Sequence, residues 1–202
     1  RLERAMAVFR PLQQQTPELR LSLSNSAACA SGVAPPADVV HLGRAGIGLY
    51  GGNPMASGQA QDVGLMPVAR VYGQILQLRE IAQGSPVGYG STYVAAGAER
   101  LMIIGVGYAD GVPRLLSGQG HVFADGKSCA IRGRVSMDML HADATVVDVS
   151  VGDWVEVIGS HISLDNVALQ AQTIAYEILT GLGKRLHRVY LNHPDKHSGT
   201  SR

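Results

Sequence analysis

The hydrophobic pattern of this 202-residue chain changes once, near residue 62, and that change constrains the fold more than any other feature. Before it, a helical repeat is followed by two short apolar stretches. After it, stretches such as "VARVYGQILQLREI" and "ATVVDVSVGDWVEVIG" alternate apolar and polar residues and are separated by Asp-Gly and Gly-Asp turns. We therefore predict an α/β segment over residues 1–62 and a mostly-β domain, a barrel or a strongly bent sheet, over residues 63–191.

The first segment has the order of elements found at the end of a parallel α/β structure. Residues 1–15 place apolar side chains at helical spacing, alternating leucines predict a strand at 19–23, and "PPADVVHLG" predicts a strand at Val39–Leu42 that ends in a turn at Gly43. One helix and two strands do not complete such a domain. We therefore expect the chain to be the end of something larger.

Near the C-terminus, "SLDNVALQAQTIAYEILTGLG" predicts one amphipathic helix. Asp165 is the expected N-cap, and Gly181 and Gly183 are the expected stops. The polar residues 192–202 are expected to form a disordered tail. The predicted apolar face consists of Val167, Ala171, Ile174, Ala175, Ile178 and Leu182.

Composition excludes several classes of protein. The net charge is +1 with 16% charged residues, so nothing indicates a nucleic-acid or polyanionic partner. No apolar run reaches the roughly 18 residues of a membrane span, so no membrane partner is expected. Cys29 and Cys129 are typical of a reduced intracellular pair. We expect a cytoplasmic protein.

Two stretches in the first segment are candidates for binding a phosphate. Asn25 and Ser26 follow a predicted strand, where α/β folds usually contact ligands, and a capping turn is the alternative. In "RAGIGLYGG", Gly46 lets the backbone approach an anion and Arg44 supplies a fixed cation. A surface turn with an incidental arginine is the alternative there.

The stretch "SPVGYGSTYVA" mounts Tyr89 between two glycines, where a tyrosine has little to pack against. A free tyrosine has a pKa near 10, so it acts as a base near neutrality only beside positive charge or hydrogen-bond donors. Bare glycines would let a substrate come close. The sequence thus predicts an acid/base catalyst, with a hairpin tyrosine packed on the sheet as the alternative.

Three further stretches place polar groups among apolar ones. In "GYADGVPR" and "GRVSMDM" the arginines would attract a carboxylate, whereas the aspartates alone are more typical of turns and strand edges. Tyr176 falls off the apolar face of its helix and is a candidate for donating its hydroxyl to a ligand, or simply part of a polar flank. The other polar residues are Tyr108, Asp110, Arg114, Arg134, Ser136 and Asp138.

Together and in this order, "SNSAA", "RAGIGLYG", "GYGSTY", "GYADGVPR", "GRVSMDM" and "YEILTGL" resemble the alanine racemases that use pyridoxal 5'-phosphate (PLP). The resemblance covers residues 1–191. It implies the C-terminal end of a (β/α)₈ TIM-type barrel, with its last two strands, over residues 1–62, followed by the C-terminal β-domain. It also implies a homodimer in which the β-domain of one subunit completes the barrel site of the other.

The resemblance implies a role for each matching residue. Asn25, Ser26, the backbone of Gly46 and Ile47, and the Tyr176 hydroxyl would hold the cofactor, with Arg44 facing its pyridine nitrogen. Tyr89 would be the base on one face of the alanine Cα. The backbone at Met137 would receive the substrate carboxylate, and the surrounding residues would be Asp138, Tyr108, Arg114 and Arg134.

The chain departs from the family in respects that bear on activity: the histidine expected to support the catalytic tyrosine, the first six barrel strands and the Schiff-base lysine have no match in it. The family's Schiff-base lysine lies in an N-terminal motif, and none of Lys127, Lys184 and Lys196 matches it. Racemisation needs a proton donor on each face of Cα. We therefore expect an alanine racemase polypeptide that is inactive alone. A broad-specificity racemase, a PLP-dependent decarboxylase and a non-catalytic assembly module are the alternatives, although decarboxylases usually present a cysteine where Tyr89 stands.

Overall fold

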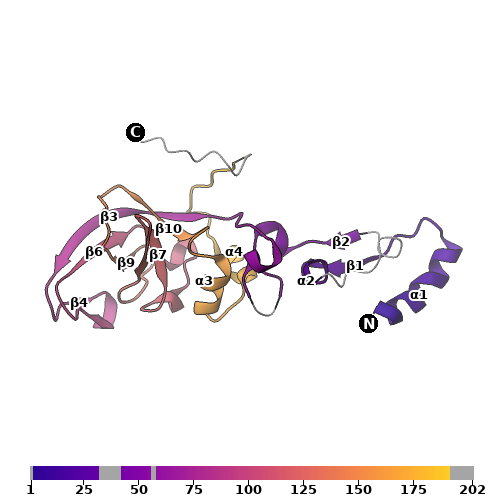
Figure 1. The fold of residues 1–202 in the computed structure, drawn as a ribbon, viewed down its shortest axis with the longest axis horizontal. Helices are drawn as coiled ribbons and strands as arrows, with labels where there is room; N and C mark the ends of the chain where they lie inside the picture. The colour runs from indigo at the N-terminus through magenta and orange to yellow at the C-terminus, as the bar shows by residue number, and fades with distance from the viewer. Residues whose placement is uncertain (1, 32–41, 56–57, 192–202) are drawn as a thin grey trace.

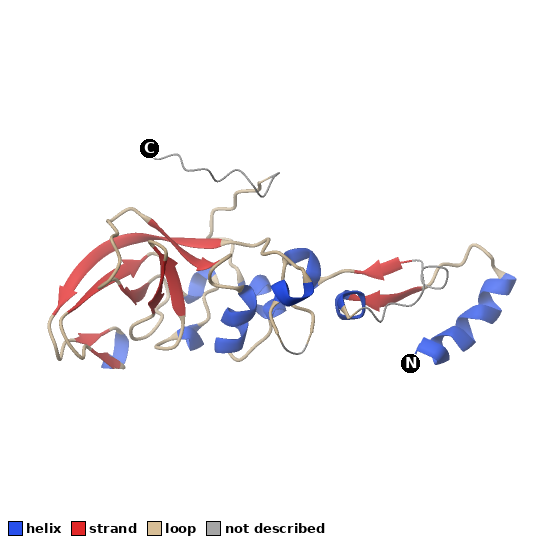
Figure 2. Ribbon diagram, in the orientation of Figure 1, coloured by secondary structure: helices blue, strands red, loops and turns tan. Residues whose placement is uncertain are grey.

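A computed structural model of the chain describes residues 2–31, 42–55 and 58–191, and the predicted tail at 192–202 lies outside them. The β-domain forms one end of the molecule, and the N-terminal elements extend away from it to the other (Figures 1 and 2). The change of pattern near residue 62 therefore corresponds to a change of architecture.

The N-terminal elements are α1 (Leu2–Gln15), β1 (Ser22–Asn25), α2 (Ser26–Ala30) and β2 (Leu42–Arg44). The two strands pair in parallel, as predicted. The first begins at Ser22 rather than residue 19, and Gly43 lies within β2 rather than in a turn, because pairing with the neighbouring strand sets the ends of a strand. The first residues of the predicted second strand, 39–41, lie outside the described residues.

The β-domain contains one six-stranded sheet in the order β8-β7-β10-β3-β6-β9. A bridge between Ile131 and Ala142 brings the two edges together, so the sheet is a nearly closed barrel, which confirms that part of the predicted fold. Its strands are β3 (Val71–Ile81), β6 (Glu99–Ile104), β7 (His121–Ala124), β8 (Lys127–Ala130), β9 (Leu140–Asp143) and β10 (Trp154–Ile158).

Shorter elements precede and join these strands, and they carry four of the predicted site residues, Ile47, Tyr89, Tyr108 and Arg114. A small hairpin pairs β4 (Pro86–Val87) with β5 (Tyr93–Val94). The 3-10 turns are η1 (Ile47–Tyr50), η2 (Ala60–Val63), η3 (Tyr89–Ser91), η4 (Tyr108–Asp110) and η5 (Arg114–Leu116).

Alternation along the strands builds the core. In β3 the side chains of Val71 and Ile75 point inward and those of Tyr72 and Leu76 outward. Burying one such aliphatic side chain contributes about 1.5–3 kcal/mol to stability. The fully buried side chains that fill the barrel include Met102, Ile104, Val122, Leu140 and Val155.

The predicted Asp-Gly turn joins β7 to β8. Asp125 and Gly126 have φ angles of 46° and 71°, the left-handed pair that a two-residue hairpin with the right-handed strand twist requires. The sequence signal and the observed turn therefore agree.

The prediction of one C-terminal helix is wrong in two respects, and the first is that the segment forms two helices, α3 (Leu164–Gln170) and α4 (Ala175–Gly181). Gln172 has a φ of 53°, which breaks the helix. The N-cap of α3 is Ser163, whose hydroxyl accepts from the Asn166 N–H, and not Asp165. The break turns Ile174 outward to 62% exposure, while Ala171 and Ala175 stay buried. The predicted stop at Gly181 is confirmed.

Both cysteines are free, Cys29 exposed and Cys129 buried. Within the residues that the structure describes, no helix combines the length and the apolar character needed to cross a membrane.

Candidate active site

The predicted phosphate-binding residues meet around one hydroxyl. Ser26 is buried at the start of α2, and its Oγ accepts hydrogen bonds from the Gly46 N–H at 2.7 Å and from the Gly48 N–H at 3.5 Å. Two backbone donors therefore already converge on one oxygen. A phosphate oxygen accepts from the same kind of donors.

Asn25 and Arg44 have partners of their own. The Asn25 side chain accepts from the Ala28 N–H at 3.0 Å, so it caps α2, as the alternative interpretation held. The Arg44 Nη1 donates to the carbonyl oxygen and to the hydroxyl of Ser22, at 3.1 and 3.0 Å. Their roles toward a cofactor stay predictions. Ile47 has a buried side chain, and its backbone role stays a prediction too.

The helix that carries Tyr176 packs against the same N-terminal segment. A Cβ added at Gly52 would meet the Ala175 Cβ at 3.2 Å, so the chain just beyond η1 touches α4 next to Tyr176. The Asp165 carboxylate of α3 fastens this segment, because it accepts from the backbone N–H groups of Asn53 at 2.9 Å and Ala60 at 2.8 Å. Tyr176, 47% exposed, therefore lies on the side of the β-domain that faces the Ser26 cluster.

Tyr89 lies at the start of η3, and its side chain is 75% exposed. Gly88 has φ 72° and ψ −176°, a conformation that is essentially restricted to glycine. A Cβ at Gly90 would come within 2.9 Å of the Arg134 Nη1. The two glycines thus set the backbone turn and let the Arg134 guanidinium pack against Gly90, the residue after Tyr89. This accounts for the glycines on both sides of Tyr89.

Residues 133–139 connect the Tyr89 loop to the Tyr108 loop. The N–H of Tyr108 donates to the Ser136 carbonyl and the N–H of Ala109 donates to the Met137 carbonyl, both at 3.0 Å. A Cβ at Gly107 would lie 2.3 Å from the Met137 oxygen, so only glycine permits this approach. The structure brings Met137 and Tyr108, 49% and 46% exposed, together.

Asp138 is held by a residue that sequence reasoning missed. Arg185 donates from Nη2 to the Asp138 Oδ1 at 2.6 Å, and its Nε lies 3.3 Å from the buried Asp110 carboxylate. The hydrogen bond to Asp138 raises the pKa of Arg185. Asp110 in turn accepts from the Gly107 N–H at 2.9 Å, so these charges also fix the Tyr108 loop. Arg114, on η5, is exposed.

The predicted site residues therefore form two clusters. One contains Ser26, Arg44, Gly46 and the nearby Tyr176; the other contains Tyr89, Tyr108, Arg134, Met137 and Asp138. The hairpin strand β4, beside Tyr89, lies at the outer end of the β-domain, whereas the helix α2, which begins at Ser26, lies beyond α4, between the β-domain and α1 (Figure 1). A single chain does not bring the two clusters together.

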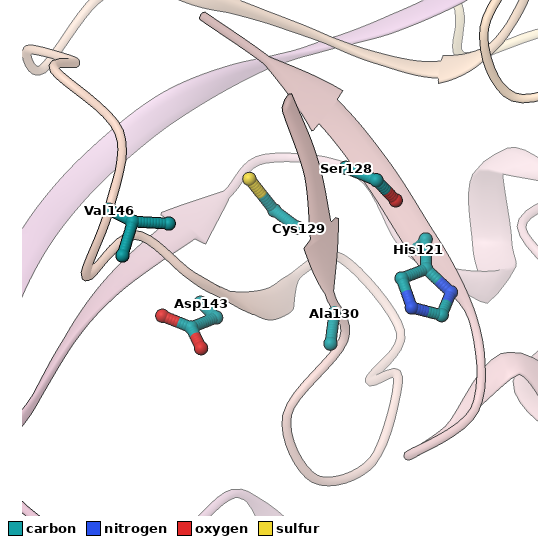
Figure 3. Close-up of a pocket in the computed structure, with 6 residues that line it drawn as sticks. All are labelled: His121, Ser128, Cys129, Ala130, Asp143 and Val146. Atoms are coloured by element: carbon teal, nitrogen blue, oxygen red, sulfur yellow. The ribbon is translucent and has the colours of Figure 1, made fainter. Parts of the chain in front are cut away.

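A cavity of about 240 Å³ lies elsewhere, where the edges of the barrel meet. Its titratable side chains do not converge, because Cys129 and His121 project on opposite sides of β8 (Figure 3). Burial raises the pKa of the Cys129 thiol, which makes it a poor nucleophile. The cavity is lined by His121, Ser128, Cys129, Ala130, Asp143 and Val146.

Comparison with known proteins gives one consistent result. A family model described as "Alanine racemase, C-terminal domain" matches residues 68–190. Alanine racemases of Methylobacterium nodulans and Acidiphilium cryptum are 39% and 42% identical over 191 and 182 residues. These matches cover 93% and 90% of this chain but 50% and 49% of the relatives. The chain thus spans about half the length of the curated relatives it matches.

Solved structures agree. The alanine racemase of Acinetobacter baumannii superposes with a TM-score of 0.79 at 38% identity, covering 91% of this chain and 51% of that one. The alanine racemase of Bartonella henselae, solved with covalently bound pyridoxal phosphate, gives 0.77 at 39% identity over 94% of this chain and 52% of its own.

Proposed function

Because the chain belongs to the alanine racemase family, we propose that it supplies the tyrosine-bearing part of a PLP-dependent alanine racemase. The reaction is the interconversion of L- and D-alanine, and the D-alanine would serve bacterial peptidoglycan synthesis. The observation that carries this proposal is Tyr89, an exposed phenol on a turn that only glycines permit, with a guanidinium packed against that turn.

The residues around Ser26 fit the phosphate of the cofactor. The N–H groups of Gly46 and Gly48 already point at one oxygen, and the Ser26 hydroxyl adds a donor. In this proposal the Ile47 backbone, the Asn25 backbone and the Tyr176 hydroxyl complete the cradle. When bound, PLP withdraws electrons from the substrate Cα and makes its proton easier to remove. Arg44, which keeps its own proton, would leave the pyridine nitrogen largely unprotonated and so limit side reactions.

Tyr89 would remove the Cα proton on one face in one direction of the reaction, while a second base delivers a proton to the other face, and in the reverse direction Tyr89 would deliver the proton. A phenol becomes a base near neutrality when cationic or donor groups stabilise its phenolate. The Arg134 guanidinium, which packs on Gly90, is a cation in contact with that turn. The Met137 backbone and Asp138 would receive the substrate carboxylate, and Tyr108 and Arg114 would line the entrance with Arg134.

The second base would be a lysine from outside these residues. Neither Lys127 nor Lys184 lies in a motif that resembles the family's lysine motif, and the Lys127 Nζ donates to the carbonyl of Val146 at the barrel edge. Lys196 lies outside the described residues. Since β4, beside Tyr89, and α2, which begins at Ser26, lie on opposite sides of the core of the β-domain, we propose that two chains in a homodimer share each site. The phosphate cradle would come from one subunit and the tyrosine from the other.

The test joins this chain to the N-terminal half of the Methylobacterium nodulans relative and adds PLP. We expect this assembled enzyme to racemise alanine in both directions, and the 202-residue chain alone to do nothing. Tyr89→Phe should lower kcat by about 10²–10⁴. The control is Tyr190→Phe, since Tyr190 is 86% exposed and outside both clusters.

Three results would count against the proposal. Undiminished turnover by Tyr89→Phe would remove the acid/base role. Racemisation by the unassembled chain would remove the need for an external lysine. Faster turnover of serine than of alanine would favour a broad-specificity racemase. A mixture of Tyr89→Phe and Ser26→Ala enzymes should recover activity if subunits share sites, since a mixed dimer keeps one intact site.

A further inference from the structure

The hairpin that carries Tyr89 is too small to hold its own shape. Strands β4 and β5 pair through two residue pairs, Pro86 with Val94 and Val87 with Tyr93. An isolated two-stranded hairpin is marginal in water even when its strands are longer. Something outside the hairpin must therefore fix the position of the tyrosine at its tip.

Tyr93, at the base of the hairpin, is fastened to the barrel through its ring and its hydroxyl. The hydroxyl donates to the Glu99 Oε1 at 2.5 Å, and the guanidinium of Arg132 lies over the ring, 4.8 Å from its centre. Both contacts are of the stronger kind, a hydrogen bond to a charged acceptor and a cation–π contact. They hold one strand of the hairpin on the barrel wall.

The partners of Tyr93 are themselves rigidly placed. Glu99 begins β6, and Arg132 donates to the Asp143 carboxylate of β9 at 2.8 Å. The Arg132 N–H also donates to the His141 carbonyl at 2.9 Å. Burial alone would raise the pKa of Asp143, but hydrogen bonds from Thr145 and Arg132 outweigh it and lower that pKa, so the carboxylate stays charged. We call Tyr93, Glu99, Arg132 and Asp143 the Tyr93 clamp.

The buried charged groups of the clamp have few hydrogen-bond partners. Within the described part of the chain, the buried Glu99 Oε2 and Arg132 Nε have no hydrogen-bond partner, and they lie 3.6 Å apart. The Tyr93 hydroxyl is thus a principal donor to a largely buried carboxylate. Burial, and then the hydrogen bond to Glu99, raise the pKa of Tyr93, which keeps it a donor. Removing the hydroxyl leaves that carboxylate poorly satisfied.

The same stretch of chain also touches the tip of the hairpin. Gly133 and Arg134 directly follow Arg132; a Cβ at Gly133 would meet the Val87 oxygen at 2.7 Å, and the Arg134 guanidinium packs on Gly90. Residues 132–134 therefore contact both strands and the tip. We propose that Tyr93, held by Glu99 and Arg132, is a positioning residue for Tyr89. Its effect on catalysis rests on the acid/base role proposed above.

The first measurement uses the 202-residue chain and needs no activity. Amide hydrogen exchange is compared between wild type, Tyr93→Phe and the matched control Tyr190→Phe. The reporting amides are those of Gly84, Ser91 and Ala95, which bond within the hairpin and its turn. We expect Tyr93→Phe to exchange there about tenfold faster, with amides of β6 unchanged. No change at the hairpin, or equal acceleration in β6, would overturn the clamp.

The second measurement uses the assembled enzyme. Tyr93→Phe should lower kcat about tenfold and leave KM for alanine within about twofold, because it misplaces a base without touching the substrate. Glu99→Gln keeps an acceptor oxygen for the tyrosine and should lie between Tyr93→Phe and wild type. Faster amide exchange in the hairpin of Tyr93→Phe with an unchanged kcat would refute the positioning role. The proposed function is decided separately, by Tyr89→Phe.

Discussion

The β-domain and the N-terminal end of this molecule differ in what holds their candidate site residues in place. In the β-domain, a nearly closed barrel with a continuous core positions Tyr89, Tyr108 and Asp138 on loops that are cross-braced by Arg134 and Arg185. At the N-terminal end, the described residues form a sheet of two short parallel strands, β1 and β2, and every residue of β2 is exposed. The loop that carries Tyr89 is held by a complete scaffold, whereas the proposed phosphate cradle depends on local hydrogen bonds around Ser26.

The largest expected difference between the two ends is the loss in free energy of unfolding when a leucine is replaced by alanine. Leu140 is fully buried in β9, while Leu12 in α1 is 49% exposed. We expect Leu140→Ala to lower the free energy of unfolding by about 2–5 kcal/mol, and Leu12→Ala to change it by less than about 0.5 kcal/mol. Urea denaturation followed by circular dichroism measures both. Equal losses would mean that α1 shares the core of the barrel, and the contrast would fail.

The next largest effect concerns the link between the two ends. Asp165→Ala removes the acceptor for two backbone N–H groups, at Asn53 and Ala60. A hydrogen bond to a charged group contributes about 1.5–3 kcal/mol to stability. We expect faster amide exchange at residues 53 and 60 and little change in β6. Asp165→Asn, which keeps one acceptor oxygen, is the matched control and should lose less. Uniformly faster exchange would show that this link stabilises the whole β-domain.

A third test asks how tightly the barrel itself is packed. A Cβ at Gly73 would come within 2.4 Å of the Ile104 Cγ2, so Gly73→Ala should destabilise the domain by about 1–3 kcal/mol through overpacking. Gly97 has open space around the same position, and Gly97→Ala should be neutral or slightly stabilising. Thermal unfolding of the two variants compares them directly. If Gly73→Ala did not change thermal stability, the side chains around Gly73 would be able to move aside to accept the added methyl group.

The same contrast explains what could be predicted from the sequence. The Asp-Gly turn, the strand alternation and the glycines around Tyr89 were predictable because each depends on residues that are neighbours in sequence. The break at Gln172 was not, because the pattern of the helix face continues through it and only packing decides. Arg185 and Asp138 are 47 residues apart, and the Tyr93 clamp joins several separate elements. Nothing local in the sequence indicates such pairs.

The smallest expected effect is a pH dependence confined to the β-domain. Glu156 is buried in β10 and accepts hydrogen bonds from the N–H groups of His161 at 2.7 Å and Ile162 at 2.9 Å. Burial alone would raise the pKa of Glu156, but these hydrogen bonds and the His161 ring outweigh it and lower the pKa below its usual 4.5. The native state therefore favours the charged carboxylate.

Because the folded pKa is the lower one, the stability contributed by Glu156 is fully present above the unfolded pKa and is lost as pH falls through the folded value. Glu156→Gln cannot titrate, so its unfolding free energy should fall less than that of wild type between about pH 6 and about pH 3. Urea midpoints at the two pH values give the comparison, and exchange at Ser22–Asn25 should not respond. An identical acid response in wild type and Glu156→Gln would show that this carboxylate does not set the acid stability of the barrel, and a response in β1 would show that the two ends unfold together.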